Sequence, residues 1–132
     1  MKSFLFISLG GAMGAAARYG SSRLFDLFTT LEFPLSTIII NTLGCFLLGI
    51  IEGIARMYGG LTTMNLLLVT GFLGSFTTFS LYTKELFSFF SSGRAGAGLA
   101  YIAAHHAAAL LFIFLGYLSG KGAAAMLGPV RF

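Results

Sequence analysis

The 132-residue chain carries a formal net charge of +4, with 57% apolar and only 9% charged residues. Soluble domains carry about 25% charged residues, so we expect the lipid bilayer to cover most of this protein's surface. The few basic residues form no run, which argues against a nucleic-acid partner. The single cysteine, Cys45, excludes a disulfide framework.

Four apolar runs are long enough to be transmembrane helices, which need about 20 residues each. Strictly alternating segments, the signature of a membrane β-barrel, are absent from the sequence. Lys2 and the first apolar run also fit a signal peptide, but because three more runs follow we expect a retained helix. The sequence therefore predicts a single all-α, four-span membrane domain, with spans at residues 4–27, 33–54, 61–90 and 95–118.

Four spans place both termini on one side of the membrane, and the basic residues then divide equally between the two sides. An excess of Lys and Arg in short loops normally sets the orientation, so an equal division leaves it undecided. Either a weak bias is resolved during insertion, or oppositely inserted copies form an antiparallel dual-topology homodimer. The terminal side carries Lys2, Arg56, Lys121 and Arg131, and the other side carries Arg18, Arg23, Lys84 and Arg94.

Small and polar residues mark one face in each of the first two spans. Gly10 and Gly14 lie one turn apart and favour close helix packing in lipid. Arg18 follows them and either reaches the interface or faces an aqueous vestibule that attracts anions. In the second span, Thr37 and Asn41 share a helix face. A membrane asparagine either bonds to a neighbouring helix or lines a pore and donates its N–H to an anion.

The third run, residues 61–90, is long for a straight crossing and contains GFLGSFTTFSLY at residues 71–82. Its glycine and hydroxyl residues tolerate or compete with helical hydrogen bonding, so we expect a break near residues 74–78. Carbonyl groups freed at such a break can coordinate a cation. The N–H groups that begin the next helix favour an anion.

Aromatic residues recur at helical spacing along the same segment. Phe79 and Tyr82 share a face, and the edge of an aromatic ring carries partial positive charge. Together with amide and hydroxyl groups, such edges could hold a small anion weakly enough for it to leave again. For Phe72 and Phe76 we expect packing against lipid.

The fourth span places Tyr101 and His105 one turn apart on a single face. The adjacent His106 points about 100° away from His105, which makes the two histidines a poor metal site. We expect His105 to be a hydrogen-bonded packing residue, with a pH-sensitive role as the alternative.

Three segments resemble the Fluc family, also called CrcB, of small four-span bacterial fluoride channels. GGAMGAAARY resembles its first span, STIIINTLGCFLLG its second, with Asn41 at the family's key asparagine, and GFLGSFTTFSLYTKE its third, the most specific of the three. The resemblance covers essentially the whole chain. It implies a fluoride-selective channel, not an enzyme, in the bacterial inner membrane. It also implies an antiparallel dual-topology homodimer with two pores and a central structural sodium ion.

The resemblance further implies roles for individual residues. Backbone carbonyl groups of Gly74 and Thr77 from both subunits would hold the sodium ion (Na+). The residues along the fluoride pore would be Asn41, Thr78, Phe79, Ser80, Tyr82 and Tyr101. The pore mouths would carry Arg18, Thr37 and Glu85.

Two positions depart from the family pattern. Residue 82 is tyrosine where the family commonly has phenylalanine, which keeps the ring edge and adds a hydroxyl group. Beyond Tyr101 the family tends to have a track of hydroxyl residues on the fourth span. Here the matching face carries His105, Ala109 and Ile113, which argues against a polar exit path along this helix.

Two other functions are compatible with four spans. A small proton-coupled multidrug exporter needs a carboxylate within the membrane, but Glu52 and Glu85 lie at span ends and the first span has no acidic residue through position 25. A structural membrane protein, whose polar residues only join helices, also fits the composition. The sequence has no nucleophile–base pair or metal-ligand cluster that suggests an enzyme.

Overall fold

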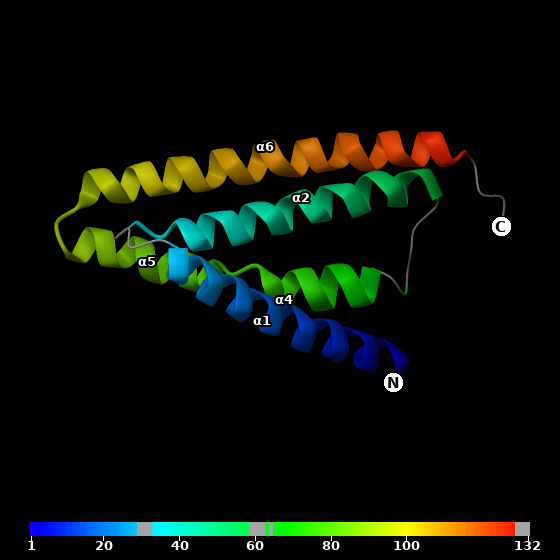
Figure 1. The fold of residues 1–132 in the computed structure, drawn as a ribbon, viewed down its shortest axis with the longest axis horizontal. Coiled ribbons are helices and arrows are strands. Elements are labelled where there is room, and N and C mark those ends of the chain that lie inside the picture. The colour runs from blue at the N-terminus through cyan, green and yellow to red at the C-terminus, as the bar shows by residue number, and fades with distance from the viewer. Residues whose placement is uncertain (29–32, 59–62, 64, 129–132) are drawn as a thin grey trace.

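The computed structural model describes residues 1–28, 33–58, 63 and 65–128. All regular secondary structure in these residues is helical, as predicted (Figure 1). The expected start of the third span, at residues 61–64, lies mostly outside the described residues, and α6 extends nine residues past residue 118, where the fourth span was expected to end. The elements are α1 (Lys2–Phe28), α2 (Leu35–Tyr58), the π-helix η1 (Asn65–Leu73), α4 (Gly74–Phe76), α5 (Phe79–Ser91) and α6 (Ala95–Leu127).

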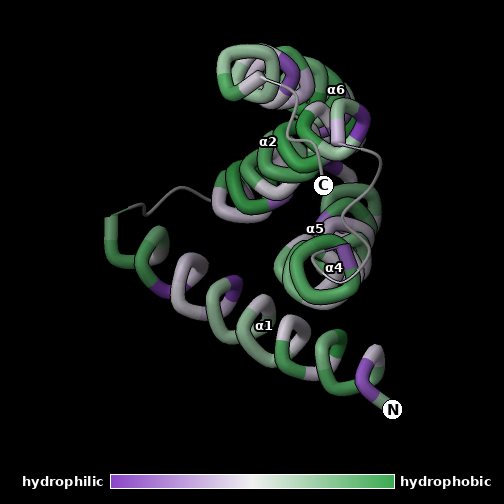
Figure 2. Tube along the Cα trace, turned by 90° about the vertical axis from the view of Figure 1, so that its right-hand side faces the viewer, coloured by the Kyte–Doolittle hydropathy of each residue, from purple (hydrophilic) through white to green (hydrophobic). Residues whose placement is uncertain are grey.

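The helices are arranged in two layers. α2 lies along α6, and α1 lies along η1 and α4 (Figures 1 and 2). α6 is the longest helix and extends over most of the molecule, and the start of α1 and the end of α6 lie toward the same end of it (Figure 1). This arrangement leaves much of each helix surface facing outward, where hydrophobic residues predominate (Figure 2).

Three segments of the described chain are long and apolar enough to cross a membrane: Leu35–Tyr58, Asn65–Ser91 and Ala95–Leu127. Hydrophobic side chains remain exposed along them, which is the pattern expected when lipid is the solvent. α1 is helical over 27 residues, but it is not among the segments that are both long and apolar enough to cross a membrane. The chain is therefore a multi-pass membrane protein with three clear spans.

Glycine residues set the close approach of α2 and α6. A Cβ atom at Gly49 or Gly53 would overlap backbone atoms of α6, and one at Gly116 or Gly120 would overlap backbone atoms of α2. Each helix thus contributes a glycine pair with i, i+4 spacing to the same contact. In lipid, such small residues allow backbones to pack directly against each other, which replaces the hydrophobic drive of water.

The glycines of α1 act in the same way on the third segment. A Cβ atom at Gly10 would overlap the carbonyl oxygen of Leu67, and one at Gly14 would overlap that of Phe72. Gly71 lies opposite Gly10, and a Cβ atom there would also come too close to the α1 backbone. The helix packing predicted from the spacing of Gly10 and Gly14 is confirmed.

The third segment changes its backbone geometry twice. It begins as a π-helix, which the sequence does not predict, and becomes α-helical for three residues at α4. Thr77 (φ −78°, ψ 156°) and Thr78 (φ −145°, ψ 112°) are then extended, and α5 begins at Phe79. The interruption lies within the interval of residues 74–78 in which a break was expected.

A tight turn joins α5 to α6. Gly93 has φ 75°, a value that L side chains rarely adopt. Its N–H donates to the Phe90 carbonyl at 3.1 Å, and the N–H of Arg94 donates to the Phe89 carbonyl at 2.8 Å. This is a Schellman motif, and it turns the chain so that α6 runs back beside α5.

One aromatic prediction was wrong. Phe76 does not face lipid: it is only 4% exposed, and its ring stacks on that of Phe72 with 5.6 Å between centroids. The short α4 turns Phe76 inward against α1 and α2, which the spacing of aromatic residues alone could not reveal.

Candidate functional site

The break in the third segment is held by the side chain of Asn41, about two turns from the start of α2. Its Oδ1 accepts a hydrogen bond from the Thr78 N–H at 2.8 Å, and its Nδ2 donates to the Thr78 carbonyl at 3.1 Å. The amide thereby satisfies both backbone groups of a residue that is outside any helix. Unpaired backbone groups are costly in a membrane, so the extended conformation of Thr78 depends on Asn41.

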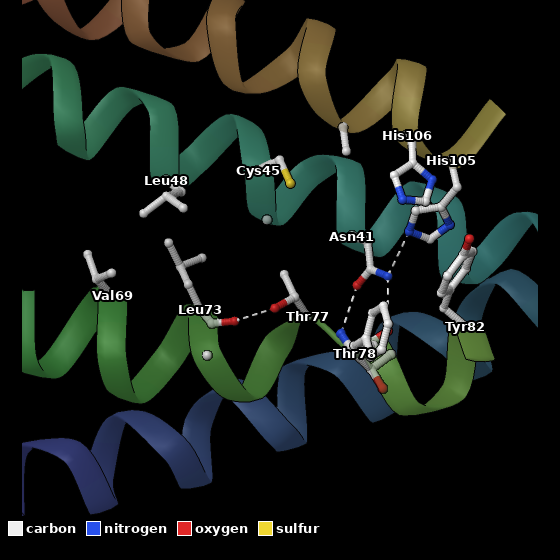
Figure 3. A pocket seen from close by; sticks show the side chains of 14 residues that line it. Asn41, Cys45, Leu48, Val69, Leu73, Thr77, Thr78, Tyr82, His105 and His106 are labelled. Carbon is white, nitrogen blue, oxygen red and sulfur yellow. Dashed lines mark hydrogen bonds between the residues drawn. The ribbon is translucent and has the colours of Figure 1, made fainter. Parts of the chain in front are cut away.

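His105 in α6 completes the bonding of Asn41. Its Nε2 lies 3.1 Å from Asn41 Nδ2 (Figure 3). Because the orientation of the amide is fixed by Thr78, Nδ2 is the donor and the neutral imidazole accepts at Nε2. Both amide hydrogens of Asn41 are therefore engaged within the chain. Of the two roles open to Asn41 from the sequence, helix joining is the one that this geometry displays.

Thr78 also begins α5. Its Oγ1 accepts a hydrogen bond from the Leu81 N–H at 3.3 Å, which is an N-cap, and lies 3.4 Å from Ser80 Oγ. An N-cap satisfies one of the free N–H groups of the first turn. Positive partial charge at this end of the 13-residue α5 is directed at the break.

These bonds release two carbonyl groups from their helical partners. The N–H of Thr78, which a continuous helix would direct to Gly74, goes to Asn41, and the N–H of Leu81, which would go to Thr77, goes to the Thr78 hydroxyl. Among the hydrogen bonds that the described residues form outside regular helices, none ends on the carbonyl oxygen of Gly74 or Thr77. Free backbone oxygens of this kind suit a hard cation such as sodium.

Arg18 reaches the break from α1. Its Nε donates to the carbonyl of Ser75 at 3.1 Å, close to the carboxyl end of α4. A cation near free carbonyls at a helix end is stabilising. Arg18 also lines a cavity of about 230 Å³ together with Thr37 and Thr78.

A second group of polar residues lies between α2, α5 and α6. Glu85 Oε1 accepts a hydrogen bond from Thr37 Oγ1 at 2.7 Å, and its Oε2 accepts one from the Tyr101 hydroxyl at 2.5 Å. Thr37 and Tyr101 are almost completely buried, at 2% and 0% exposed. The carboxylate is thus bound on both oxygens by buried hydroxyl groups.

Two aromatic residues follow the break with opposite exposure. Tyr82 is buried against Tyr101 and His105, whereas Phe79 is 78% exposed although its ring lies 5.8 Å from that of Tyr82. Both line a cavity of about 350 Å³ that also borders Asn41, Thr77 and Thr78 (Figure 3). Thr78 borders both this cavity and the cavity at Arg18, so the break lies between the two cavities.

The predicted site residues fall into two clusters. The first surrounds the break, and the second is the carboxylate cluster; Ser80 is exposed and borders neither cavity. His105, which was expected to be a hydrogen-bonded packing residue, joins the first cluster through its bond to Asn41. Its spacing of four residues from Tyr101 was the available signal. The break cluster contains Arg18, Asn41, Gly74, Thr77, Thr78, Phe79 and Tyr82, and the carboxylate cluster contains Thr37, Glu85 and Tyr101.

Comparison with known proteins places the chain in a family. Residues 5–117 match the model described as "CrcB-like protein, Camphor Resistance (CrcB)". A protein of Haemophilus ducreyi is 40% identical over 121 residues, covering 92% of this chain and 94% of the relative. A protein of Ruminiclostridium cellulolyticum is 37% identical over 127 residues, covering 96% and 98%.

A third relative, from Rhizobium etli, is 42% identical over 105 residues, covering 79% of this chain and 83% of the relative. All three relatives carry the name "Fluoride-specific ion channel FluC". The family match spans most of the chain, and the alignments extend over nearly the full length of two relatives. The chain therefore belongs to the CrcB-like family.

Proposed function

We propose that this protein is a fluoride-selective channel that lets fluoride leave the cytoplasm passively. The observation that carries the proposal is the 37–42% identity, over most of the chain, to proteins named fluoride-specific ion channels. An anion leaving a negative-inside cell gains about 2.3 kcal/mol per 100 mV, so the process requires no other energy source. The bacterial inner membrane is the proposed location.

The chemistry of the break supports passage of a small anion. Ring edges of Phe79 and Tyr82, hydroxyl groups of Thr78 and Ser80, and the amino end of α5 offer partial positive charge without a full cation in direct contact. Weak, multiple contacts suit conduction because an ion must leave as readily as it enters. Arg18 at one cavity and the cluster of Thr37, Glu85 and Tyr101 are the proposed pore mouths.

The proposed functional unit is an antiparallel homodimer of four-span subunits, with α1 as the additional span and two pores in each dimer. Two observations support it. The ring of Phe79 is 78% exposed and borders an open cavity, so a second subunit would be needed to enclose a pore there. Basic residues also divide evenly between the two ends, although Arg131 lies outside the described residues.

A sodium ion is the proposed structural cation of the dimer. The carbonyl oxygens of Gly74 and Thr77 are available for it because their helical donors bind elsewhere. These two oxygens from one subunit are too few to enclose a hard cation. A second subunit would supply the same two oxygens again, which links the ion to dimer formation.

Ion efflux from liposomes that contain the purified protein tests the proposed function. The liposomes are loaded with fluoride or chloride, and efflux is followed with an ion-selective electrode after a potassium ionophore is added. Rapid fluoride efflux with little chloride efflux is expected. Absence of fluoride flux, or equal flux of the two anions, would refute the channel function. A sidedness reporter at the C-terminus tests the topology, since labelling from only one face would refute dual insertion.

A further inference from the structure

Tyr82 and His105 form a close ring pair at the break. Their ring centroids are 4.4 Å apart with 49° between planes, the shortest separation among the aromatic pairs of the described residues. The side chains come from α5 and α6 and are only 6% and 8% exposed. Both residues border the 350 Å³ cavity, and His105 lies between Asn41 and Tyr82 (Figure 3).

The hydrogen-bond pattern determines which nitrogen of His105 carries the proton. Asn41 Nδ2 is a donor, as its orientation toward Thr78 requires, so Nε2 of the neutral ring is the acceptor. The proton therefore lies on Nδ1. This Nδ1 is buried and has no hydrogen-bond partner among the described residues. Buried polar groups are normally paired, and a histidine on a helix can direct Nδ1 to its own backbone, as His106 does with the Ile102 carbonyl at 2.9 Å.

The hydroxyl group of Tyr82 is a second unpaired donor in the same place. Within the described chain it forms no hydrogen bond, whereas the hydroxyl groups of Tyr58 and Tyr101 each have an acceptor. Two donors without acceptors in the described chain, on two tilted rings that border one cavity, indicate a site for an acceptor that is not part of the chain.

We propose that His105 Nδ1–H and the Tyr82 hydroxyl together donate to fluoride as it passes the break. This inference rests on the proposed channel function and adds a two-donor site to it. Asn41 fixes the imidazole in the tautomer that can donate, so it acts on the ion through His105. Because Nδ1 is covered in the structure, the ion reaches it when the Tyr82 ring shifts. Fluoride, the smallest and strongest acceptor among the halides, is the anion that a pair of neutral donors favours most over chloride.

The alternative is a purely structural pair, in which the imidazole N–H points at the face of the Tyr82 ring. Such a contact keeps the rings in place and requires no tyrosine hydroxyl. If the pair is only structural, loss of the donor at Nδ1 and loss of the acceptor at Nε2 should affect fluoride affinity to the same extent. Variants that remove one property at a time therefore separate the two accounts.

Two substitutions at residue 105 each retain one of the two hydrogen-bonding positions of the imidazole ring. The amide of glutamine reaches the position of Nε2 and can accept from Asn41, but it leaves no donor at Nδ1. The amide of asparagine occupies the position of Nδ1 and can donate there, but it does not reach Asn41. Fluoride flux through H105Q, H105N and Tyr82→Phe in liposomes is measured as a function of fluoride concentration, with Tyr117→Phe as the control, because Tyr117 lies in the same helix α6 but does not border this cavity.

We expect the fluoride concentration for half-maximal flux to rise about tenfold in H105Q and in Tyr82→Phe. The rise should be clearly smaller in H105N than in H105Q, because H105N keeps a donor at the Nδ1 position although it loses the bond to Asn41, and it should stay below about threefold in Tyr117→Phe. Equal effects of H105Q and H105N, or an unchanged Tyr82→Phe, would overturn the two-donor site. Gel filtration and circular dichroism of each variant exclude misfolding as the cause of a loss.

The wild-type protein in the same assay distinguishes the two proposals. If it carries fluoride and all variants match it, the channel function stands and the inference fails. If the wild type carries no fluoride, the proposed function itself fails.

Discussion

The side chain of Asn41 replaces the helical partners of Thr78, since it accepts from the Thr78 N–H at 2.8 Å and donates to the Thr78 carbonyl at 3.1 Å. A residue of one helix thereby determines the backbone of another, 37 positions along the chain. The same bonds leave the Gly74 carbonyl without its helical donor and place Phe79 at the start of α5. Several features of the candidate site therefore depend on a single amide.

Asn41→Asp should disrupt the hydrogen bonds that hold the Thr78 backbone in its extended conformation. A carboxylate cannot donate to the Thr78 carbonyl or to His105 Nε2, and its charge would lie beside both acceptors. Leaving buried polar groups unpaired costs about 1–3 kcal/mol each, so we expect the detergent-solubilised protein to unfold more readily and fluoride flux to fall at least about tenfold. Thermal unfolding and liposome efflux measure the two effects.

Thr42→Val is the matched control for this substitution. Thr42 is the next residue of α2 and is also buried, but its Oγ1 has no hydrogen-bond partner in the described chain. Replacing an unpaired buried hydroxyl with a methyl group should leave stability unchanged or slightly raised. If Thr42→Val proved as damaging as Asn41→Asp, the loss would come from altered packing of α2 and the role given to Asn41 would be wrong.

Glu85→Gln should disturb the carboxylate cluster. Glu85 accepts from Thr37 on one oxygen and from Tyr101 on the other. Glutamine has one acceptor oxygen and one NH₂ group, so one of the two buried hydroxyl groups must turn away or lose its acceptor. We expect a loss of about 1–3 kcal/mol in the free energy of unfolding, measured by denaturation in detergent.

Glu52→Gln provides the comparison for that loss. Glu52 pairs with Arg56 at 2.9 Å on an exposed part of α2. Exposed ion pairs of this kind contribute about 0–1 kcal/mol. A cost at Glu85 no larger than the cost at Glu52 would contradict the importance assigned to the buried hydroxyl groups.

Gly116→Ala should separate α2 from α6. An added Cβ atom would overlap the Phe46 backbone, which cannot move aside as a flexible side chain would. Overpacking typically costs about 1–3 kcal/mol, so a lower unfolding temperature is expected. Gly122→Ala, six residues along α6, has nothing within 4 Å of its added Cβ atom. It should be neutral or stabilising by about 0.5–1 kcal/mol, and a loss there as large as at Gly116 would refute the packing argument.

The sequence predicted the helical class and the position of the break because both follow from local properties. Long apolar runs identify the spans, and the glycine and hydroxyl residues of 71–82 compete with regular helical bonds. Close helix packing at Gly10 and Gly14 was also predictable, since small residues at i, i+4 indicate close approach in lipid, although the partner segment was not.

Other features depend on contacts between distant residues and could not be predicted in this way. The bonds of the Asn41 amide to Thr78 and His105 join residues far apart in the sequence, so spacing along α2 alone could not identify them. Phe76 was expected to face lipid because spacing does not reveal where a three-residue helix directs its side chain. The π-helix at Asn65–Leu73 has no side-chain signature that distinguishes it from an α-helix.

Phe79→Ile tests the most exposed of the proposed pore residues. Phe79 is 78% exposed in the single chain, so replacing it removes little packing within the subunit and should leave the fold intact. Isoleucine is apolar but has no ring edge to attract an anion. If the ring contacts fluoride, flux should fall about tenfold or more, because an interaction worth about 1.4 kcal/mol corresponds to a factor of ten.

Phe87→Ile is the control for Phe79→Ile, since Phe87 lies in the same helix, is 70% exposed and does not border the cavity at the break. Loss of flux in both variants would point to a general need for aromatic residues on α5, for example in contact with lipid. Normal flux in Phe79→Ile would remove this residue from the pore. Only a loss confined to Phe79 matches a ring edge that meets the ion, because both substitutions remove the same surface from the same helix.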